Sequence, residues 1–76
     1  MSLEDLVRKA LKDFENTSSE TILEILNQIK PNFKSELISE YLDGKIQKIL
    51  DAKDEAEKKS QCKALTPYLD WYLQGL

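Results

Sequence analysis

The chain contains no histidine and a single cysteine, Cys62. Histidine is the commonest general base near neutral pH and a frequent metal ligand, so its absence excludes the usual triads and imidazole metal sites. A lone cysteine cannot form an internal disulfide, and here it lacks an imidazole that would activate it as a nucleophile. We interpret Cys62 as a helix residue at the edge of the core, and we predict that the protein is not an enzyme and needs no cofactor.

Sequence motifs for phosphates and metal ions are also missing. There is no glycine-rich phosphate loop. The best trial for a calcium loop starts at Asp51, but it places Lys53 at a ligand position, and Ala56 and Cys62 stand where a glycine and a bidentate glutamate belong. The other carboxylates are spaced as on solvated helix faces, and a catalytic acid pair needs a cleft that so small a bundle scarcely provides. We therefore predict no metal and no catalytic site.

No hydrophobic run approaches the roughly 20 residues that a membrane span requires, and the N-terminus lacks the basic and apolar regions of a signal peptide. The sequon Asn16-Thr17-Ser18 is therefore interpreted as turn chemistry rather than a glycosylation site. We expect a cytoplasmic protein that does not contact membranes. Met1-Ser2 is compatible with a native start. The alternative is a remnant of cloning, and the chain would then be a piece of a longer protein.

Glycine and proline occur only twice each among 76 residues, and valine and threonine are scarce, so the composition favours helices over strands. With 41% hydrophobic and 33% charged residues, the chain has enough apolar surface to fold and enough charge to stay dissolved. The sequence predicts one all-α domain over residues 1–76, a compact bundle of four to five short antiparallel helices.

The first two helices are marked by N-caps and apolar stripes. Ser2 is the expected N-cap of the first, and Thr17 with Glu20 forms a capping box for the second. The first stripe consists of Leu3, Leu6, Val7, Ala10, Leu11 and Phe14. The second consists of Ile22, Leu23, Ile25, Leu26 and Ile29. The second stripe spans an arc of roughly 160°, so we expect this helix to lie at the centre of the bundle.

Pro31 ends the second helix, and Asn32 is the expected cap of the third. The apolar positions of the third helix are Phe33, Leu37, Ile38, Tyr41 and Leu42. Beyond Gly44 the apolar positions are Ile46, Ile49, Leu50, Ala52 and Ala56, and the stripe drifts by roughly 90°. We favour a bend or break at Gly44 over a straight helix that changes its packing partner halfway.

Residues 51–63 form a run of alternating charges with strong helix formers. The acid-before-base pairs Asp54–Lys58 and Glu55–Lys59 have the spacing that stabilises a helix in water. Only small residues are available for burial on this helix: Ala52, Ala56, Ser60 and Ala64. We interpret the charge run as a solvated helix face.

The last helix begins at Thr66-Pro67, with Thr66 as N-cap, and ends near Gln74 and Gly75. Its apolar stripe consists of Leu65, Leu69, Leu73 and Leu76. The aromatic residues Tyr68, Trp71 and Tyr72 widen the apolar arc to roughly 200°, more than one core can cover. They are our candidate partner-binding residues. The alternative is that Trp71 lies against lysine stems of the charged helix.

These features predict a protein–protein interaction module that binds another protein chain, either a second copy of itself or a larger assembly. The alternative is a small helix-turn-helix-like nucleic-acid-binding or regulatory protein, built from the second and third helices. The net charge of −3 and an acidic outer face at Glu36, Glu40 and Asp43 disfavour it. We therefore do not expect nucleic acid to be the partner.

Overall fold

The computed structural model describes residues 2–75. The interpretation of Met1 as a start residue and the place of Leu76 in the last apolar stripe therefore lie outside the described residues. Helices account for every regular element in it, which confirms the all-α prediction. The elements are α1 (Leu3–Lys12), the short 3-10 helix η1 (Phe14–Asn16), α2 (Ser19–Ile29), the 3-10 helix η2 (Lys30–Asn32), α3 (Glu36–Leu50), α4 (Glu55–Ala64) and α5 (Thr66–Leu73).

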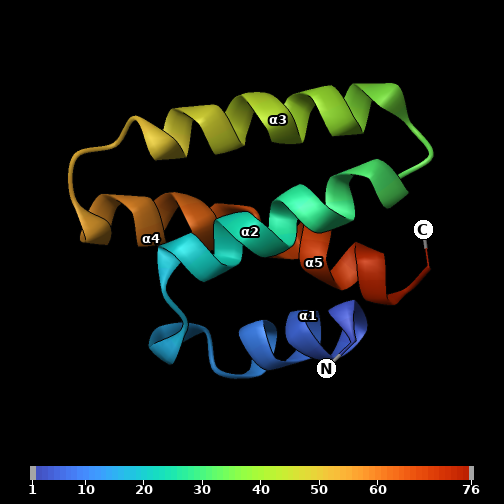
Figure 1. Ribbon diagram of the computed structural model, residues 1–76, viewed down its shortest axis with the longest axis horizontal. Coiled ribbons are helices and arrows are strands. Elements are labelled where there is room, and N and C mark those ends of the chain that lie inside the picture. The colour runs from blue at the N-terminus through green and yellow to red at the C-terminus, as the bar shows by residue number, and fades with distance from the viewer. Residues whose placement is uncertain (1, 76) are drawn as a thin grey trace.

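Helix α2 lies across the centre and contacts α1, α3, α4 and α5 (Figure 1). The helices α1 to α4 reverse direction from one to the next, whereas α5 continues the general course of α4 after a break at Leu65. The central position follows from the wide apolar arc of α2, whose five predicted core residues are all buried. The sequence-based prediction for α2 is confirmed.

The core joins these residues to side chains from each of the other four α-helices and from two connecting residues, Phe33 and Leu65. Its remaining members are Val7, Ala10, Phe33, Leu42, Ile46, Ile49, Cys62, Leu65 and Leu69. Cys62 is completely buried, so its predicted place at the edge of the core is wrong. Because α4 has few apolar side chains, the thiol serves as its contribution to the core. Burial, and secondly the charge of Glu55, raise the pKa of Cys62 to about 11.

Two predicted helix starts shift to a neighbouring serine. The hydroxyl of Ser18, not Thr17, caps α2 and accepts from the amide of Thr21 at 3.2 Å. Thr17 instead donates its hydroxyl to the carbonyl of Asp13, which closes the end of α1. Ser35 caps α3 in place of Asn32, which belongs to η2. These helices begin later than expected because each turn first continues as a 3-10 helix.

Of the other two predicted N-caps, Ser2 is confirmed and Thr66 is wrong, and the predicted helix end at Gly75 is confirmed. Ser2 caps α1 as predicted, accepting from the amide of Asp5 at 3.2 Å. Thr66 does not cap α5, because its hydroxyl donates to the carbonyl of Lys63 at 2.8 Å and continues the turn from α4. Gly75 follows α5 with a φ of +80°, a conformation that favours glycine, and so ends the helix as expected.

The predicted bend or break at Gly44 is wrong, because α3 runs through it without interruption. Glycine costs about 1 kcal/mol in a helix interior. That cost is outweighed by burial of Leu42 and Ile46 on either side of it, since a fully buried side chain of this size gains about 1.5–3 kcal/mol. The helix ends instead at Leu50, with Asp51 as its C-cap. The next helix, α4, begins after its N-cap Asp54, whose side chain accepts a hydrogen bond from the amide of Glu57 at 2.7 Å.

The small residues expected to form the buried stripe of α4 do not do so. Ala56, Ser60 and Ala64 are exposed. The helix is rotated so that Cys62 enters the core, and two charged residues of the run, Glu55 and Lys59, make tertiary hydrogen bonds. The interpretation as a purely solvated face is therefore wrong for these two positions.

Candidate functional site

Aromatic rings from three segments meet where α5 approaches α3. Tyr68 on α5 lies at the centre, with its ring centroid 6.2 Å from Phe33 and 6.0 Å from Tyr41 on α3. Trp71 packs edge-on against the same ring, with centroids 5.1 Å apart. Edge-to-face pairs at such separations contribute about 0.5–1.5 kcal/mol beyond burial. Tyr68 therefore orders the two outer rings, Tyr41 and Trp71.

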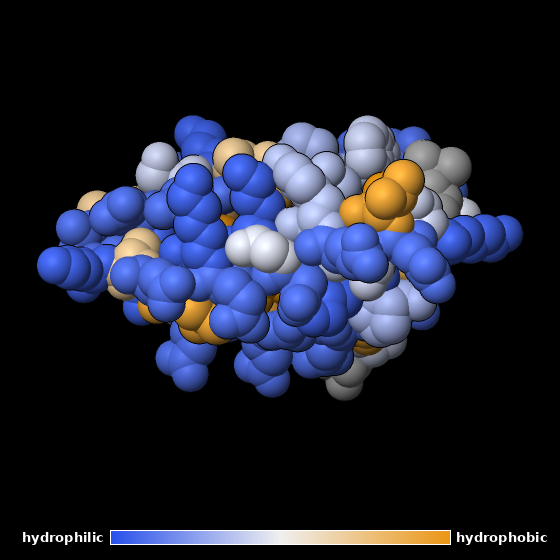
Figure 2. Space-filling view, turned by 90° about the horizontal axis from the view of Figure 1, so that it is seen from above, coloured by the Kyte–Doolittle hydropathy of each residue, from blue (hydrophilic) through white to orange (hydrophobic). Residues whose placement is uncertain are grey.

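The outer members of this cluster are open to solvent. Trp71 is 40% exposed and Tyr41 is 49% exposed. Leu37, one turn before Tyr41 on the same side of α3, is 78% exposed. We call Leu37, Tyr41, Tyr68 and Trp71 the aromatic patch. Figure 2, which looks down on α3, shows a hydrophobic spot with paler residues beside it, on a face that is otherwise mostly hydrophilic.

Leu37 and Tyr41 belong to the apolar stripe predicted for the third helix, but the core does not cover them. The buried face of α3 is formed by Leu42, Ile46 and Ile49, and the two exposed residues lie roughly 120° away from it around the helix. Because α3 is straight, only one of the two apolar faces can meet the core. The drift of the stripe along the sequence was the signal that could have revealed this second face.

Two of the three predicted binding residues belong to the patch. Tyr68 is half-buried, and Trp71 is exposed with its ring packed against Tyr68. Tyr72 is half-buried and packs against the core, so the structure does not bring it into the patch. Burial, and secondly the neighbouring Tyr41, raise the pKa of the Tyr68 hydroxyl above its ordinary value.

A groove of about 360 Å³ between α3 and α4 adjoins the patch at Tyr41. Its α3 wall carries Lys45 and Lys48, and the ammonium of Lys45 lies 5.4 Å above the Tyr41 ring. Its α4 wall is formed by Glu57, Gln61 and Ala64. The ion pairs found within residues 2–75 join Arg8 to Glu4 and Asp5, and Lys30 to Asp43. Neither groove lysine takes part in them.

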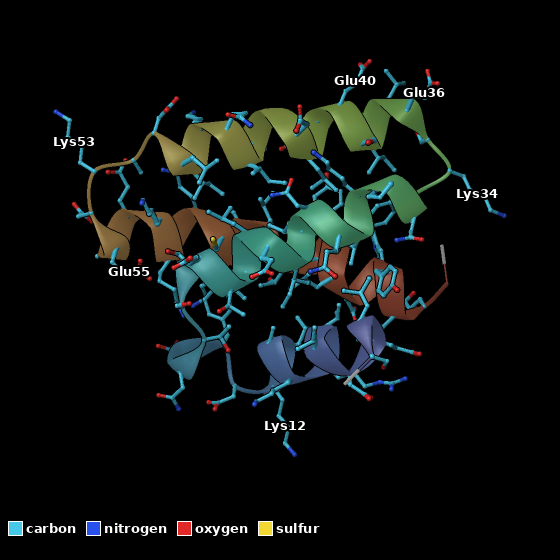
Figure 3. All side chains as sticks on the ribbon, in the orientation of Figure 1. Lys12, Lys34, Glu36, Glu40, Lys53 and Glu55 are labelled. Carbon is cyan, nitrogen blue, oxygen red and sulfur yellow. The ribbon has the colours of Figure 1, made fainter. Side chains whose placement is uncertain are left out.

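The acids of α3 lie on its other flank. Glu36, Glu40 and Asp43 are exposed, and Figure 3 shows Glu36 and Glu40 pointing away from the body of the molecule. Phosphate groups would be repelled there. The surface that a recognition helix would offer to DNA is thus acidic, whereas the flank that faces α4 carries lysines and aromatic rings.

A larger hollow, of about 520 Å³, lies between α2 and α4 and is lined by Glu20, Glu24 and Glu55 among others. The carboxylate of Glu55 is occupied by hydrogen bonds from Ser19. Across the part of the chain that the structure covers, acidic and cysteine side chains nowhere gather in a group that could hold a metal ion. In the same residues, no helix has the length and hydrophobicity to cross a membrane.

Comparisons of the chain with protein-family models, with curated proteins and with solved structures give no match.

Proposed function

We propose that this chain is a non-enzymatic protein–protein interaction module whose contact surface is the aromatic patch. The observation that carries the proposal is the exposure of Leu37, Tyr41 and Trp71 near one another on α3 and α5, with Tyr41 and Trp71 both packed on Tyr68. Large aromatic side chains held in place by neighbours lose little entropy on binding, and Trp and Tyr are enriched among the hot spots of protein interfaces.

The arrangement also explains why these side chains are not used for folding. The core is complete without them, because α3 already buries Leu42, Ile46 and Ile49, and α5 buries Leu69. Adjacent exposed apolar groups reduce solubility unless a partner covers them. The partner in this proposal is another protein chain. The molecular mass of the purified protein in solution decides whether that chain is a second copy.

The test compares capture of proteins from the native host by the wild-type chain, by Leu37→Ser/Trp71→Ala and by Leu50→Ser. Leu50 is the matched control, because it is a 51%-exposed leucine on α3 that lies outside the patch and lines the hollow between α2 and α4. We expect the double variant to lose a discrete partner about tenfold or more, while Leu50→Ser retains it.

Circular dichroism would verify that all three proteins keep their helices. Light scattering of the purified wild type would show whether the partner is a second copy, since a dimer would have twice the mass of 8.8 kDa. Equal capture by the double variant, or the opposite pattern in which only Leu50→Ser loses the partner, would contradict the proposed contact surface.

A further inference from the structure

We infer that the aromatic patch and the adjoining α3–α4 groove bind an acidic amphipathic helix of a different protein. This inference rests on the proposed function and names the chemistry of its partner. Its basis is the distribution of charge: the groove side of α3 carries Lys45 and Lys48, although the chain as a whole has a net charge of −3.

The apolar and basic residues of α3 follow one line along the helix. Leu37, Tyr41 and Lys48 are spaced four and seven residues apart, which places them on one side. From Leu37 to Lys48 this line extends about 16 Å at 1.5 Å per residue. A helix of about three turns has the same length, and it would present apolar anchors at positions i, i+4 and i+7 to such a groove.

The side of the groove formed by α4 and α5 fits a partner helix of the same length, with apolar side chains at one end and acidic ones at the other. Tyr68 and Trp71 on α5 stand opposite the aromatic end of the line, and Gln61 and Ala64 continue the wall along α4. Glu57 is the one carboxylate lining the groove. Apolar anchors of the partner would therefore meet the patch, and its acidic side chains would meet Lys45 and Lys48.

Gly44 adds an independent observation on the same line. It is exposed, its backbone is that of an ordinary helix, and a Cβ placed on it would meet nothing within 4 Å. Packing within the chain therefore does not require a glycine there. A partner helix that approaches the backbone of α3 closely would benefit from the missing side chain.

A second copy of the chain is a poorer occupant. A two-fold symmetric interface uses the same surface of both chains, so it would bring four groove lysines together with only the two copies of Glu57 to offset them. Single-stranded nucleic acid also combines stacking with negative charge. However, the groove offers only two lysines beside Glu57, and the exposed acids Glu36 and Glu40 lie on the other flank of α3.

The test uses Trp71, the only tryptophan of the chain, as its reporter. The probes are designed amphipathic peptides of about three turns with leucines at i, i+4 and i+7. One carries glutamates on its polar face, one carries lysines there, and one has the acidic composition in shuffled order. A single-stranded thymidine oligonucleotide is the fourth probe. Burial of a partly exposed indole should shift its emission to shorter wavelength.

We expect the acidic peptide to bind with a saturable blue shift that weakens with added salt, and the other probes to bind at least about tenfold more weakly. Reversal of both charges, Lys45→Glu/Lys48→Glu, should weaken the acidic peptide about tenfold and strengthen the basic one. The matched control is Lys9→Glu/Lys12→Glu on α1, which changes the net charge equally. Lys12 points away from α3 at the far side of the molecule (Figure 3), so this variant should bind like the wild type.

Three results would overturn the inference: no shift with the acidic peptide, equal binding of the basic or shuffled peptide, or tighter binding of the oligonucleotide. A mass of twice 8.8 kDa that falls to 8.8 kDa in Trp71→Ala would overturn it in favour of self-association. Binding of the basic or shuffled peptide would leave the proposed function intact. The proposed function is tested by a different experiment: it would be contradicted if the Leu37→Ser/Trp71→Ala variant captured the partner as well as the wild type does.

Discussion

The carboxylate of Glu55 on α4 accepts two hydrogen bonds from Ser19, the first residue of α2, one from its backbone amide at 3.0 Å and one from its hydroxyl at 2.6 Å. Ser19 is nearly completely buried. The acid thus places a negative charge at the N-terminal end of α2, where unpaired amides favour it. Glu55, a residue of the charge run 51–63, thus caps the N-terminus of the central helix α2, although it lies 36 residues further along the chain.

We predict that Glu55→Gln lowers the melting temperature, because it removes the charge that faces the start of α2. Glu57→Gln, on the same helix, makes the same change where no such contact exists and should have a much smaller effect. The Ser19 hydroxyl hydrogen bond, and then that of its amide, lower the pKa of Glu55 below its ordinary value of 4.5. A lowered pKa means that the stabilisation is present above pH 4.5 and is lost as the pH falls through the folded value.

The difference in melting temperature between wild type and Glu55→Gln should therefore be constant near neutral pH and shrink in acid. Calorimetry at a series of pH values would measure it. A difference that stays unchanged down to the acid unfolding transition would mean that the charge of Glu55 does not stabilise the fold.

The ammonium of Lys59, one turn after Glu55, donates to the carbonyl oxygens of Phe14 and Thr17 and lies 4.2 Å from the Phe14 ring centroid. Lys59→Met keeps most of the stem but leaves both carbonyls without this donor, so we expect a loss of about 1–2 kcal/mol. Lys58→Met is the control, with no hydrogen bond of this kind among the described residues. Urea denaturation measures both, and equal losses would argue against the assigned role of Lys59.

We expect Gly44→Ala to stabilise the protein by about 1 kcal/mol, because alanine is the better helix former and the added methyl meets no neighbour. Gly75→Ala should not stabilise it, since Gly75 has a φ of +80°. Thermal denaturation of both variants distinguishes the two positions. A destabilising Gly44→Ala would indicate that the backbone of α3 bends there in solution.

The thiol of Cys62 should react very slowly with a thiol reagent in the native protein, because it is buried and its pKa is raised to about 11. In urea the reaction should become fast, so its rate under native conditions reports opening of the α4 region. If the folded chain were labelled about as fast as the unfolded chain, the buried position of the Cys62 thiol would be contradicted.

Leu69→Ala should cost about 2–5 kcal/mol, because this leucine is completely buried. Trp71→Ala, two residues on, should cost clearly less than Leu69→Ala, because the indole is 40% exposed and packs at the surface against Tyr68. Chemical denaturation gives both values. A loss for Trp71→Ala as large as that for Leu69→Ala would place the indole in the core and remove the basis for a separate patch.

The periodicity of the sequence was sufficient to predict the helices and the central place of α2, since side-chain burial follows helical spacing directly. It also pointed to Tyr68 and Trp71, because α5 carries more apolar surface than one core can cover. The bend predicted at Gly44 was wrong because a local glycine penalty of about 1 kcal/mol was weighed without the burial of Leu42 and Ile46, which overrides it.

What the sequence alone determined is thus the set of helices, most of the core and one half of the aromatic patch. Tertiary structure alone decided the rest. Leu37 and Tyr41 look like core residues until the rotation of α3 is known, and Glu55 and Lys59 look like solvated charges until the start of α2 and the η1 turn lie beside them. Contacts between residues some forty positions apart leave no trace in local spacing, because only the folded chain brings those groups within hydrogen-bonding distance.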